Sequence, residues 1–246
     1  MVTKVVPGML IATPTAEQVA REACARMKRA IHDAIKERGS ATIALSGGNS
    51  PLDAYRCLAA QSIDWNKVQI YWVDERAVPP DDERSNYAGA KRALLDAITI
   101  PAANVHRMHG QHSDLAKAAE DYETELRDTV KAHVAGIPAL DLVVLGIGDD
   151  GHTASLFPGE DTVDITDRLV AAVPARSGRE ARLTLTAPVL ENAKASVIIV
   201  IGKSKHDALE RVWSTSGDVK ETPARIVRGF RGAITWVIDR AAGGMG

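Results

Sequence analysis

The sequence predicts an α/β fold in which helices sandwich a mainly parallel, Rossmann-like sheet. Short, wholly apolar runs recur along the 246 residues, as in strands that are buried on both faces. The longer segments between these runs place their apolar residues at helical spacing. Glycine-rich or charged turns follow several of the runs directly, which is the order of strand, loop and helix in a parallel sheet.

The composition limits the class of protein. Hydrophobic residues make up 45% of the chain and charged residues 25%, which is enough for one sizeable core. We expect a single domain over residues 1–246, because no repeat or linker interrupts the pattern. The net charge of −2, without a basic block, gives no reason to expect nucleic acid or a membrane as a partner. Without a secretion signal or an apolar run of roughly 18 residues, we expect a soluble, cytoplasmic protein.

The first third of the chain predicts strand, helix, strand and helix. Residues 4–12 alternate loosely before a proline and predict an edge strand. Thr15 begins a long apolar stripe at helical spacing, and Gly39 ends it. Residues 42–45 predict a buried strand, and the apolar residues that follow Pro51 predict the next helix.

The middle third continues the alternation. Residues 68–73 predict the next strand. Ser85 is a suitable N-cap for a helix that runs through residue 95. Another long helix is predicted from residue 113 or 114 to about residue 134, where alanine, leucine and tyrosine recur at helical spacing.

The last third opens with the wholly apolar residues 142–145, which predict a strand buried on both faces of the sheet. Four more strands are predicted at residues 169–173, 182–186, 196–201 and 233–238. Short helices are predicted at residues 188–192 and 222–227, and residues 202–213 predict a turn, with Lys203, Lys205 and His206, that enters a helix.

The turn after residues 42–45 reads SGGNSP and is a candidate phosphate loop. Gly47 and Gly48 let the backbone approach a ligand, while Ser46 and Asn49 add polar side chains. The exposed N–H groups at the start of a helix favour an anion. A simple tight turn fits the local sequence equally well. The Walker pattern is absent, which disfavours nucleoside triphosphate hydrolysis.

Three charged residues, Asp74, Glu75 and Arg76, follow the strand predicted at residues 68–73. The carboxyl ends of parallel strands share one edge of a sheet, so these charges should lie beside the SGGN turn and the later GDDGH turn. The alternative is a solvated loop with an internal ion pair. The topology favours a common cleft.

The turn GIGDDGH follows residues 142–145 and matches GxGxxG formally. Two aspartates would oppose a pyrophosphate, so a dinucleotide site is disfavoured. A metal site of His152 with Asp149 or Asp150 lacks further ligands at a recognisable spacing, and we predict neither metal nor cofactor. We interpret His152 as a general base or acid that a neighbouring carboxylate orients. A histidine that caps a turn is the alternative.

The two cysteines, Cys24 and Cys57, both fall in predicted helices without CxxC or metal-type spacing. We expect them to be free, mostly buried thiols, as in a reducing cytosol.

Five stretches, in this order, resemble the 6-phosphogluconolactonase family, which is related to the glucosamine-6-phosphate isomerase/deaminases. They read LSGGNSP, WVDERAVPPDDERSNY, DLVVLGIGDDGHTASLFPG, RLTLT and GKSKHDAL. The resemblance implies a fold of the sugar-phosphate isomerase type. It also implies hydrolysis of 6-phosphoglucono-1,5-lactone to 6-phosphogluconate in the oxidative pentose phosphate pathway, without a metal or a nucleotide.

The resemblance also implies roles for single residues. His152 would deprotonate the attacking water, and Asp149 would orient the imidazole, with Asp150 left open as the alternative. Arg76 would stabilise the oxyanion or bind substrate oxygens, and Asp74 would bind hydroxyls or position the water. The phosphate would be held by a set of polar residues with Lys203 and Arg179 as alternatives: Ser46, Gly47, Gly48, Asn49, Arg182 and Lys205.

One position separates the two related activities. The deaminases resemble DGHIAFNEP at this loop, with a glutamate that helps to open the sugar ring, whereas Phe157 stands there in this chain. Lactone hydrolysis is therefore favoured, and an isomerase/deaminase or a noncatalytic sugar-phosphate-binding module remains the alternative. We expect a small sugar-phosphate lactone as the binding partner and a monomer or weak homo-oligomer.

Overall fold

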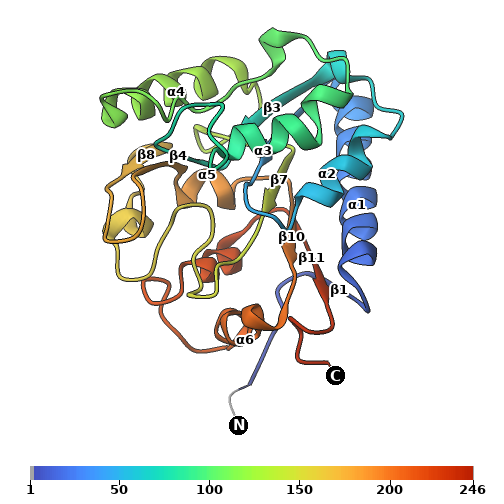
Figure 1. Ribbon diagram of the computed structural model, residues 1–246, viewed down its shortest axis with the longest axis vertical. Helices are drawn as coiled ribbons and strands as arrows, with labels where there is room; N and C mark the ends of the chain where they lie inside the picture. Colours follow the sequence, from blue (N-terminus) through green and yellow to red (C-terminus); the bar gives the residue numbers. More distant parts are fainter. Residues whose placement is uncertain (1–2, 246) are drawn as a thin grey trace.

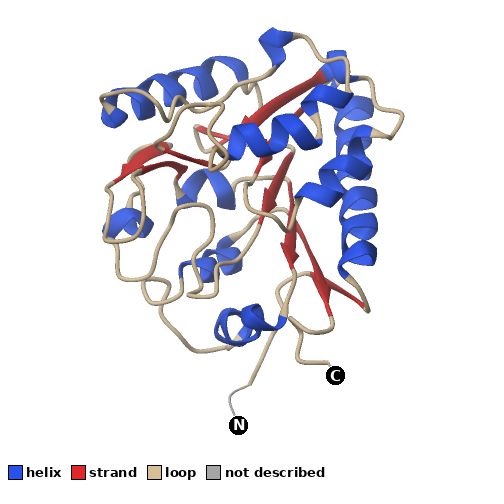
Figure 2. Cartoon of the chain, viewed as in Figure 1, coloured by secondary structure: helices blue, strands red, loops and turns tan. Residues whose placement is uncertain are grey.

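A six-stranded, fully parallel sheet runs through the centre of the computed structural model, which describes residues 3–245 (Figures 1 and 2). Its strands, in spatial order, are β1 (Met9–Thr13), β11 (Ala233–Asp239), β10 (Ala195–Val200), β7 (Leu142–Leu145), β2 (Ala41–Leu45) and β3 (Val68–Trp72). Helices cover both faces, with α1 and α2 on one side and α5 and α6 on the other (Figure 1). The predicted α/β class is confirmed. The single domain over residues 1–246 stays a prediction, and residues 1, 2 and 246 lie outside the described part.

The helices begin and end close to the predicted positions. They are α1 (Ala16–Arg38), α2 (Leu52–Ala59), α3 (Asn86–Ala93), α4 (Leu115–Thr129), α5 (Ala187–Glu191) and α6 (His206–Trp213). Thr15 caps α1 by accepting a hydrogen bond from the backbone of Gln18, and Gly39 ends it with φ of 80°. Short 3₁₀ turns lie at Trp65–Lys67, Leu95–Ala97, Ala102–Asn104, Asp161–Asp164, Lys203–Lys205 and Pro223–Gly229. Within residues 3–245, no helix is long and apolar enough to cross a membrane.

The helix predicted to reach about residue 134 is shorter than expected. It ends at Thr129, and the chain then forms a small antiparallel hairpin of β5 (His133–Val134) and β6 (Ile137–Pro138). Ala135 and Gly136 turn this hairpin with φ of 52° and 78°, a conformation that a helix does not allow.

A second sheet is antiparallel and joins β4 (Asp74–Arg76), β9 (Arg182–Leu185) and β8 (Val170–Val173). The charged turn predicted after β3 is therefore itself a short strand. Asp74 lies opposite Thr184, and Arg76 lies opposite Arg182. This pairing fixes the two charged residues beside the end of the main sheet.

Strand β7 is fully buried, as predicted for residues 142–145, and Asp141 anchors its amino end. The Asp141 carboxylate accepts hydrogen bonds from the backbone and side chain of Thr42, and it pairs with Arg38 and Lys194, each at 2.8 Å. These bonds hold β7 in place next to β2, at the end of the sheet opposite to the pocket described below.

The expectation of two free thiols is wrong, because Cys24 and Cys57 form a disulfide. Helices α1 and α2 pack side by side and bring the two Cα atoms within 6.0 Å, which is inside the range that a disulfide spans. Sequence spacing did not reveal this pair, since the contact depends on how two separate helices pack.

Replacing both cysteines by serine should lower the free energy of unfolding by roughly 3 to 4 kcal/mol, because the cross-link joins residues 33 apart in the sequence. Urea unfolding of the oxidised protein, with and without a reductant, measures this effect. The midpoint of the wild type should fall in the reductant, and that of the Cys24→Ser/Cys57→Ser variant should not move. A wild-type midpoint that is insensitive to the reductant would contradict the prediction.

Candidate active site

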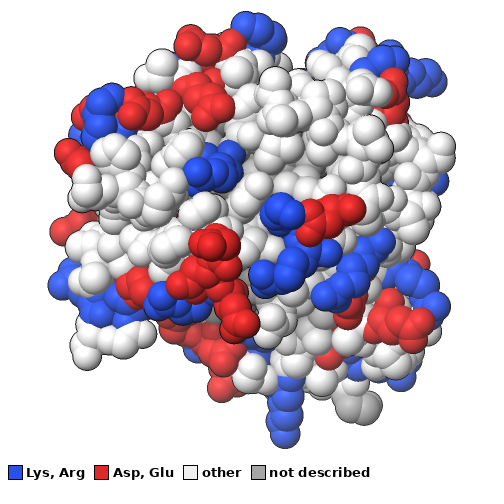
Figure 3. All heavy atoms as spheres, turned by 45° about the horizontal axis from the view of Figure 1, so that its top comes forward, with Lys and Arg blue, Asp and Glu red and all other residues white. Residues whose placement is uncertain are grey.

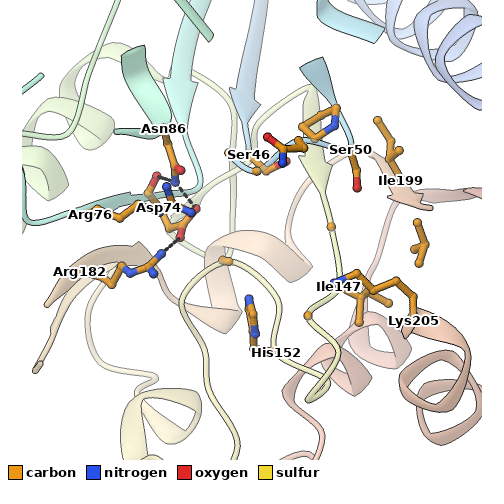
Figure 4. Close-up of a pocket in the computed structure, with 18 residues that line it drawn as sticks. Ser46, Ser50, Asp74, Arg76, Asn86, Ile147, His152, Arg182, Ile199 and Lys205 are labelled. Carbon is orange, nitrogen blue, oxygen red and sulfur yellow. Dashed lines mark hydrogen bonds and ion pairs between the residues drawn. The ribbon is translucent and has the colours of Figure 1, made fainter. Parts of the chain in front are cut away.

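A cavity of about 200 Å³ opens at the carboxyl edge of the main sheet (Figure 4). The loops that follow β2, β3, β7 and β10 all reach it, because parallel strands end at the same edge. Every residue predicted for the site lines this cavity except Asp149. The topology thus brings together segments that lie far apart in the sequence.

His152 points into the cavity from the loop after β7 (Figure 4). Its Nδ1 lies 2.6 Å from Oδ1 of Asp150, which also accepts a hydrogen bond of 3.0 Å from the backbone N–H of His152. A carboxylate is an acceptor, so Nδ1 carries the proton in this bond, and Nε2 keeps its lone pair. The ring packs against Phe157, with 4.7 Å between the centroids.

Gly148 makes this arrangement possible. A Cβ atom at this position would lie 2.0 Å from Nδ1 of His152 and 2.5 Å from Oδ1 of Asp150. Any side chain would therefore separate the imidazole from its carboxylate. The glycine recognised in the sequence as a loop residue is required for the His–Asp contact.

Asp149 does not orient His152, in contrast to the role that the sequence suggested. Its carboxylate turns away and pairs with Nζ of Lys205 at 2.5 Å, and Ser204 donates a second hydrogen bond at 3.3 Å. The hydrogen bond from Lys205 holds the pKa of Asp149 below its ordinary value. Asp150, which follows Asp149 and precedes the tight turn at Gly151, contacts the imidazole instead.

The contact with His152 also keeps Asp150 ionised. Partial burial acts to raise the pKa of this carboxyl, but the hydrogen bonds from the side chain and backbone of His152 outweigh it and lower the pKa to about 2. Asp150 is therefore a carboxylate at any pH at which the imidazole acts as a base.

Asp74 forms the opposite wall of the cavity and is 5% exposed. Asn86 donates to its Oδ1 at 3.0 Å, and Arg182 approaches its Oδ2 to 3.8 Å (Figure 4). Ser155 donates to the same Oδ2 at 2.6 Å. Such neutral donors allow a carboxylate to be buried near one cation. Sequence reasoning missed Asn86 and Ser155. Asn86 is the first residue of α3 and Ser155 lies in the loop after β7, and neither position signals a contact with Asp74.

The three charges of the DER segment have different environments. Arg76 lines the cavity and donates to the carbonyl of Arg84. Glu75 turns away from the cavity, and its buried carboxylate accepts hydrogen bonds from the hydroxyl of Ser85, which caps α3, and from the first two backbone N–H groups of α3. Burial raises the pKa of Glu75. Asp74 and Arg76 therefore face the cavity, while Glu75 caps a helix.

The turn after β2 has the features of an anion site. Tyr55 fixes it by bonding both the N–H and the carbonyl of Ser46. For residues 47–50, no contact within the described chain engages a backbone N–H group. These groups lie at the start of α2, where the positive end of the helix favours an anion. Lys205 reaches the same cavity from the loop after β10.

The two alternative phosphate ligands lie elsewhere. Arg179 pairs with Glu160 at 2.6 Å and lies 3.7 Å above the ring of Phe157, and it does not line the cavity. Lys203 is exposed and does not line it either. In the part of the chain from residue 3 to residue 245, no three histidine, cysteine or acidic side chains gather in a way that would hold a metal ion.

Comparisons with known proteins identify the relatives of this chain. The family model described as glucosamine-6-phosphate isomerases/6-phosphogluconolactonase matches residues 14–236. A 6-phosphogluconolactonase of Synechocystis sp. is 42% identical over 213 residues, covering 87% of this chain and 88% of that protein. A 6-phosphogluconolactonase of Haemophilus influenzae is 36% identical over 207 residues, covering 81% and 85%. The solved 6-phosphogluconolactonase from Trypanosoma cruzi superposes with a TM-score of 0.86 at 28% identity, covering 99% of this chain and 98% of that one. The resemblance drawn from the sequence motifs is confirmed.

The low pKa of Asp150 predicts a pH-dependent contribution to stability. The pKa falls from 3.8 to about 2 on folding, so this contribution is present above pH 3.8 and is lost as the pH falls through about 2. Asp150→Asn should therefore cost about 1 kcal/mol near pH 5, after allowance for solvent screening. The cost should shrink toward pH 2. Urea unfolding between these pH values measures it, with Asp128→Asn at an exposed carboxylate as the control. A cost that stays constant with pH would contradict the prediction.

Proposed function

The chain belongs to the glucosamine-6-phosphate isomerase/6-phosphogluconolactonase family, and we propose that it hydrolyses 6-phospho-D-glucono-1,5-lactone to 6-phospho-D-gluconate in the oxidative pentose phosphate pathway. The observation that carries the chemistry is the 2.6 Å contact between Asp150 and Nδ1 of His152. It leaves Nε2 as a base inside a cavity that also holds an anion-binding turn.

His152 begins the reaction as a general base. Nε2 takes a proton from a water molecule, and the water oxygen attacks the lactone carbonyl carbon. The tetrahedral intermediate then collapses, the bond from C1 to the ring oxygen breaks, and the imidazolium returns its proton to that oxygen. The product is a carboxylic acid that ionises near neutral pH, so each turnover releases one proton. Asp150 stabilises the imidazolium that forms between the two steps.

The wall opposite His152 supplies charge to the reacting centre. Arg76 and Arg182 line the cavity, and either guanidinium stabilises the oxyanion or binds substrate oxygens. Asp74 keeps further acceptor capacity after its bonds to Asn86 and Ser155, and it orients a substrate hydroxyl or the water.

The phosphate binds at the turn of residues 46–49 together with Lys205. In the structure the ammonium of Lys205 is paired with Asp149, whose side chain is 60% exposed. A phosphate dianion attracts the ammonium more strongly than a single carboxylate does, and Asp149 is free to turn into water. Substrate binding thus exchanges one partner of Lys205 for another.

The alternative activity of the family is ring opening with release of ammonia. It is less well supported because of the residue at one loop position. The resemblance implies a glutamate there in the related deaminases, whereas in this chain Phe157 occupies the position and packs against His152. An aromatic ring supplies no proton to a sugar ring oxygen. Proton release from freshly generated phosphogluconolactone, compared with ammonia release from glucosamine 6-phosphate, distinguishes the two activities. Ammonia without proton release from the lactone would overturn the proposal.

We also propose that the protein acts in the cytoplasm on a diffusible substrate, as a monomer or weak homo-oligomer, without a metal, a cofactor, a nucleic acid or a membrane. Acidic and basic side chains are interspersed on the face in Figure 3, which suits a freely dissolved enzyme better than a phosphate-backbone surface.

His152→Asn should lower kcat for lactone hydrolysis by roughly 10²- to 10⁴-fold, because it removes the general base. The affinity for 6-phosphogluconate should change little, since the phosphate contacts remain. A pH-stat assay corrected for spontaneous hydrolysis gives the rate, and calorimetry gives the affinity. His133→Asn, at an exposed histidine of the β5–β6 hairpin, is the control. Wild-type turnover in His152→Asn would remove this residue from the mechanism.

Lys205→Ala should raise KM by roughly tenfold or more and leave kcat nearly unchanged, because it removes a charged contact to the phosphate that is present in the ground state as well as in the transition state. Lys203→Ala is the matched control, two residues away and exposed, and its KM should stay within about twofold of the wild type. An unchanged KM in Lys205→Ala, or an equal rise in both variants, would place the phosphate elsewhere.

A further inference from the structure

Asn86 lies between two parts of the site that have separate tasks. It is the first residue of α3 and is 3% exposed. Its Nδ2 donates to the carbonyl oxygen of Asp74 at 2.9 Å and to Oδ1 of Asp74 at 3.0 Å. Both amide hydrogens are therefore used on one residue, which fixes the orientation of the amide group.

The other end of the same amide meets the phosphate loop. A Cβ atom on Gly47 would lie only 1.7 Å from Oδ1 of Asn86, so this oxygen occupies the space beside the backbone of Gly47. Only glycine leaves room for the contact. The side chain of Asn86 thus spans from the turn of residues 46–49 to the buried carboxylate of Asp74 (Figure 4).

The oxygen of this amide has no hydrogen-bond donor. Within the described residues, Oδ1 of Asn86 is buried and unpartnered, and so is Oγ of the neighbouring Ser46. Unpartnered buried acceptors are rare and costly in folded proteins. Beside them lie the backbone N–H groups of residues 47–50, which also lack partners within the described chain.

We propose that Asn86 is a positioning residue that couples the phosphate loop to Asp74, so that a phosphate bound at the loop improves catalysis at the lactone carbonyl. The inference rests on the proposed function. Binding energy from a remote, unreactive part of a substrate raises the rate when it aligns groups at the reacting centre. Here the path is short and consists of Gly47, the rigid amide of Asn86, and Asp74.

Ser155 provides the matched comparison. Its hydroxyl donates to the other oxygen of Asp74 at 2.6 Å, but it belongs to the loop after β7, and its backbone N–H bonds to Thr184. Removing Ser155 therefore disturbs Asp74 without touching the phosphate loop. Removing Asn86 disturbs Asp74 and the link to the loop together.

The experiment supplies the lactone and the phosphate of the proposed substrate as two separate molecules. Hydrolysis of unphosphorylated glucono-1,5-lactone is measured with and without saturating inorganic phosphate, after subtraction of the spontaneous rate. In the wild type, phosphate should raise kcat/KM for the lactone by about tenfold, the usual size of coupling between two sites. Ser155→Ala should be slower in both conditions and keep the same ratio. Asn86→Ala should lose most of the activation.

A second variant and a binding measurement separate this loss from a folding defect. Asn86→Ser keeps a small polar residue at the start of α3 and should also lose the activation. Calorimetry with inorganic phosphate should show that both variants still bind the anion. No activation in the wild type, full activation in the Asn86 variants, or an equal loss in Ser155→Ala would overturn the inference. If the wild type hydrolyses neither 6-phosphogluconolactone nor glucono-1,5-lactone above the spontaneous rate, the proposed function itself fails.

Discussion

The site depends on the parallel pairing of β7 with β2 and β10. Parallel strands must all end at one edge of a sheet, so the turns after them meet although the chain between them makes long excursions. The pairing is secured at the far edge by Asp141, whose carboxylate collects bonds from β2, Arg38 and Lys194 before the apolar strand begins. Strand β7 carries only apolar side chains, so the polar residues of this segment lie in the turn that follows it. The buried strand fixes the position of the turn that contains Asp150 and His152.

The two carboxylates that pair with cations around the cavity differ in their freedom to respond to substrate. Asp149 is exposed and holds Lys205 through one ion pair, so a phosphate can displace it at little cost. Asp74 is buried, accepts hydrogen bonds from Asn86 and Ser155, and lies 3.8 Å from Arg182. If its carboxylate moved away, these buried donors would lose their hydrogen-bond acceptor, which is costly. If the phosphate binds at Lys205 as proposed, it replaces the exposed partner Asp149, while the buried Asp74 keeps its hydrogen bonds.

Local sequence patterns predicted most of the helices and strands, but they did not predict side-chain contacts between segments that lie far apart in the sequence. Thr15 and Gly39 act through neighbouring backbone groups, so the ends of α1 could be read from the sequence. Helix α4 ends where Val130 takes an extended conformation, with ψ of 104°, and this valine continues the apolar stripe of the helix, so the pattern gives no signal for the end. The cavity-lining residues followed from strand order, but the choice of Asp150 over Asp149 depends on a turn that no spacing rule specifies. The disulfide and the Asn86–Asp74 contact likewise join separate elements.

Phe157 links the sequence to the choice of reaction. Its ring packs against His152, and the guanidinium of Arg179, which Glu160 binds at 2.6 Å, lies 3.7 Å from the ring centroid. The neighbour of the imidazole at this position is therefore an aromatic ring and not a carboxylic acid. Opening a sugar ring needs an acid at the ring oxygen as well as a base at carbon, whereas lactone hydrolysis lets one imidazole take a proton and return it in succession. In the proposed mechanism, His152 is the one base that this loop needs for the hydrolysis, and Phe157 stands where ring opening would require an acid.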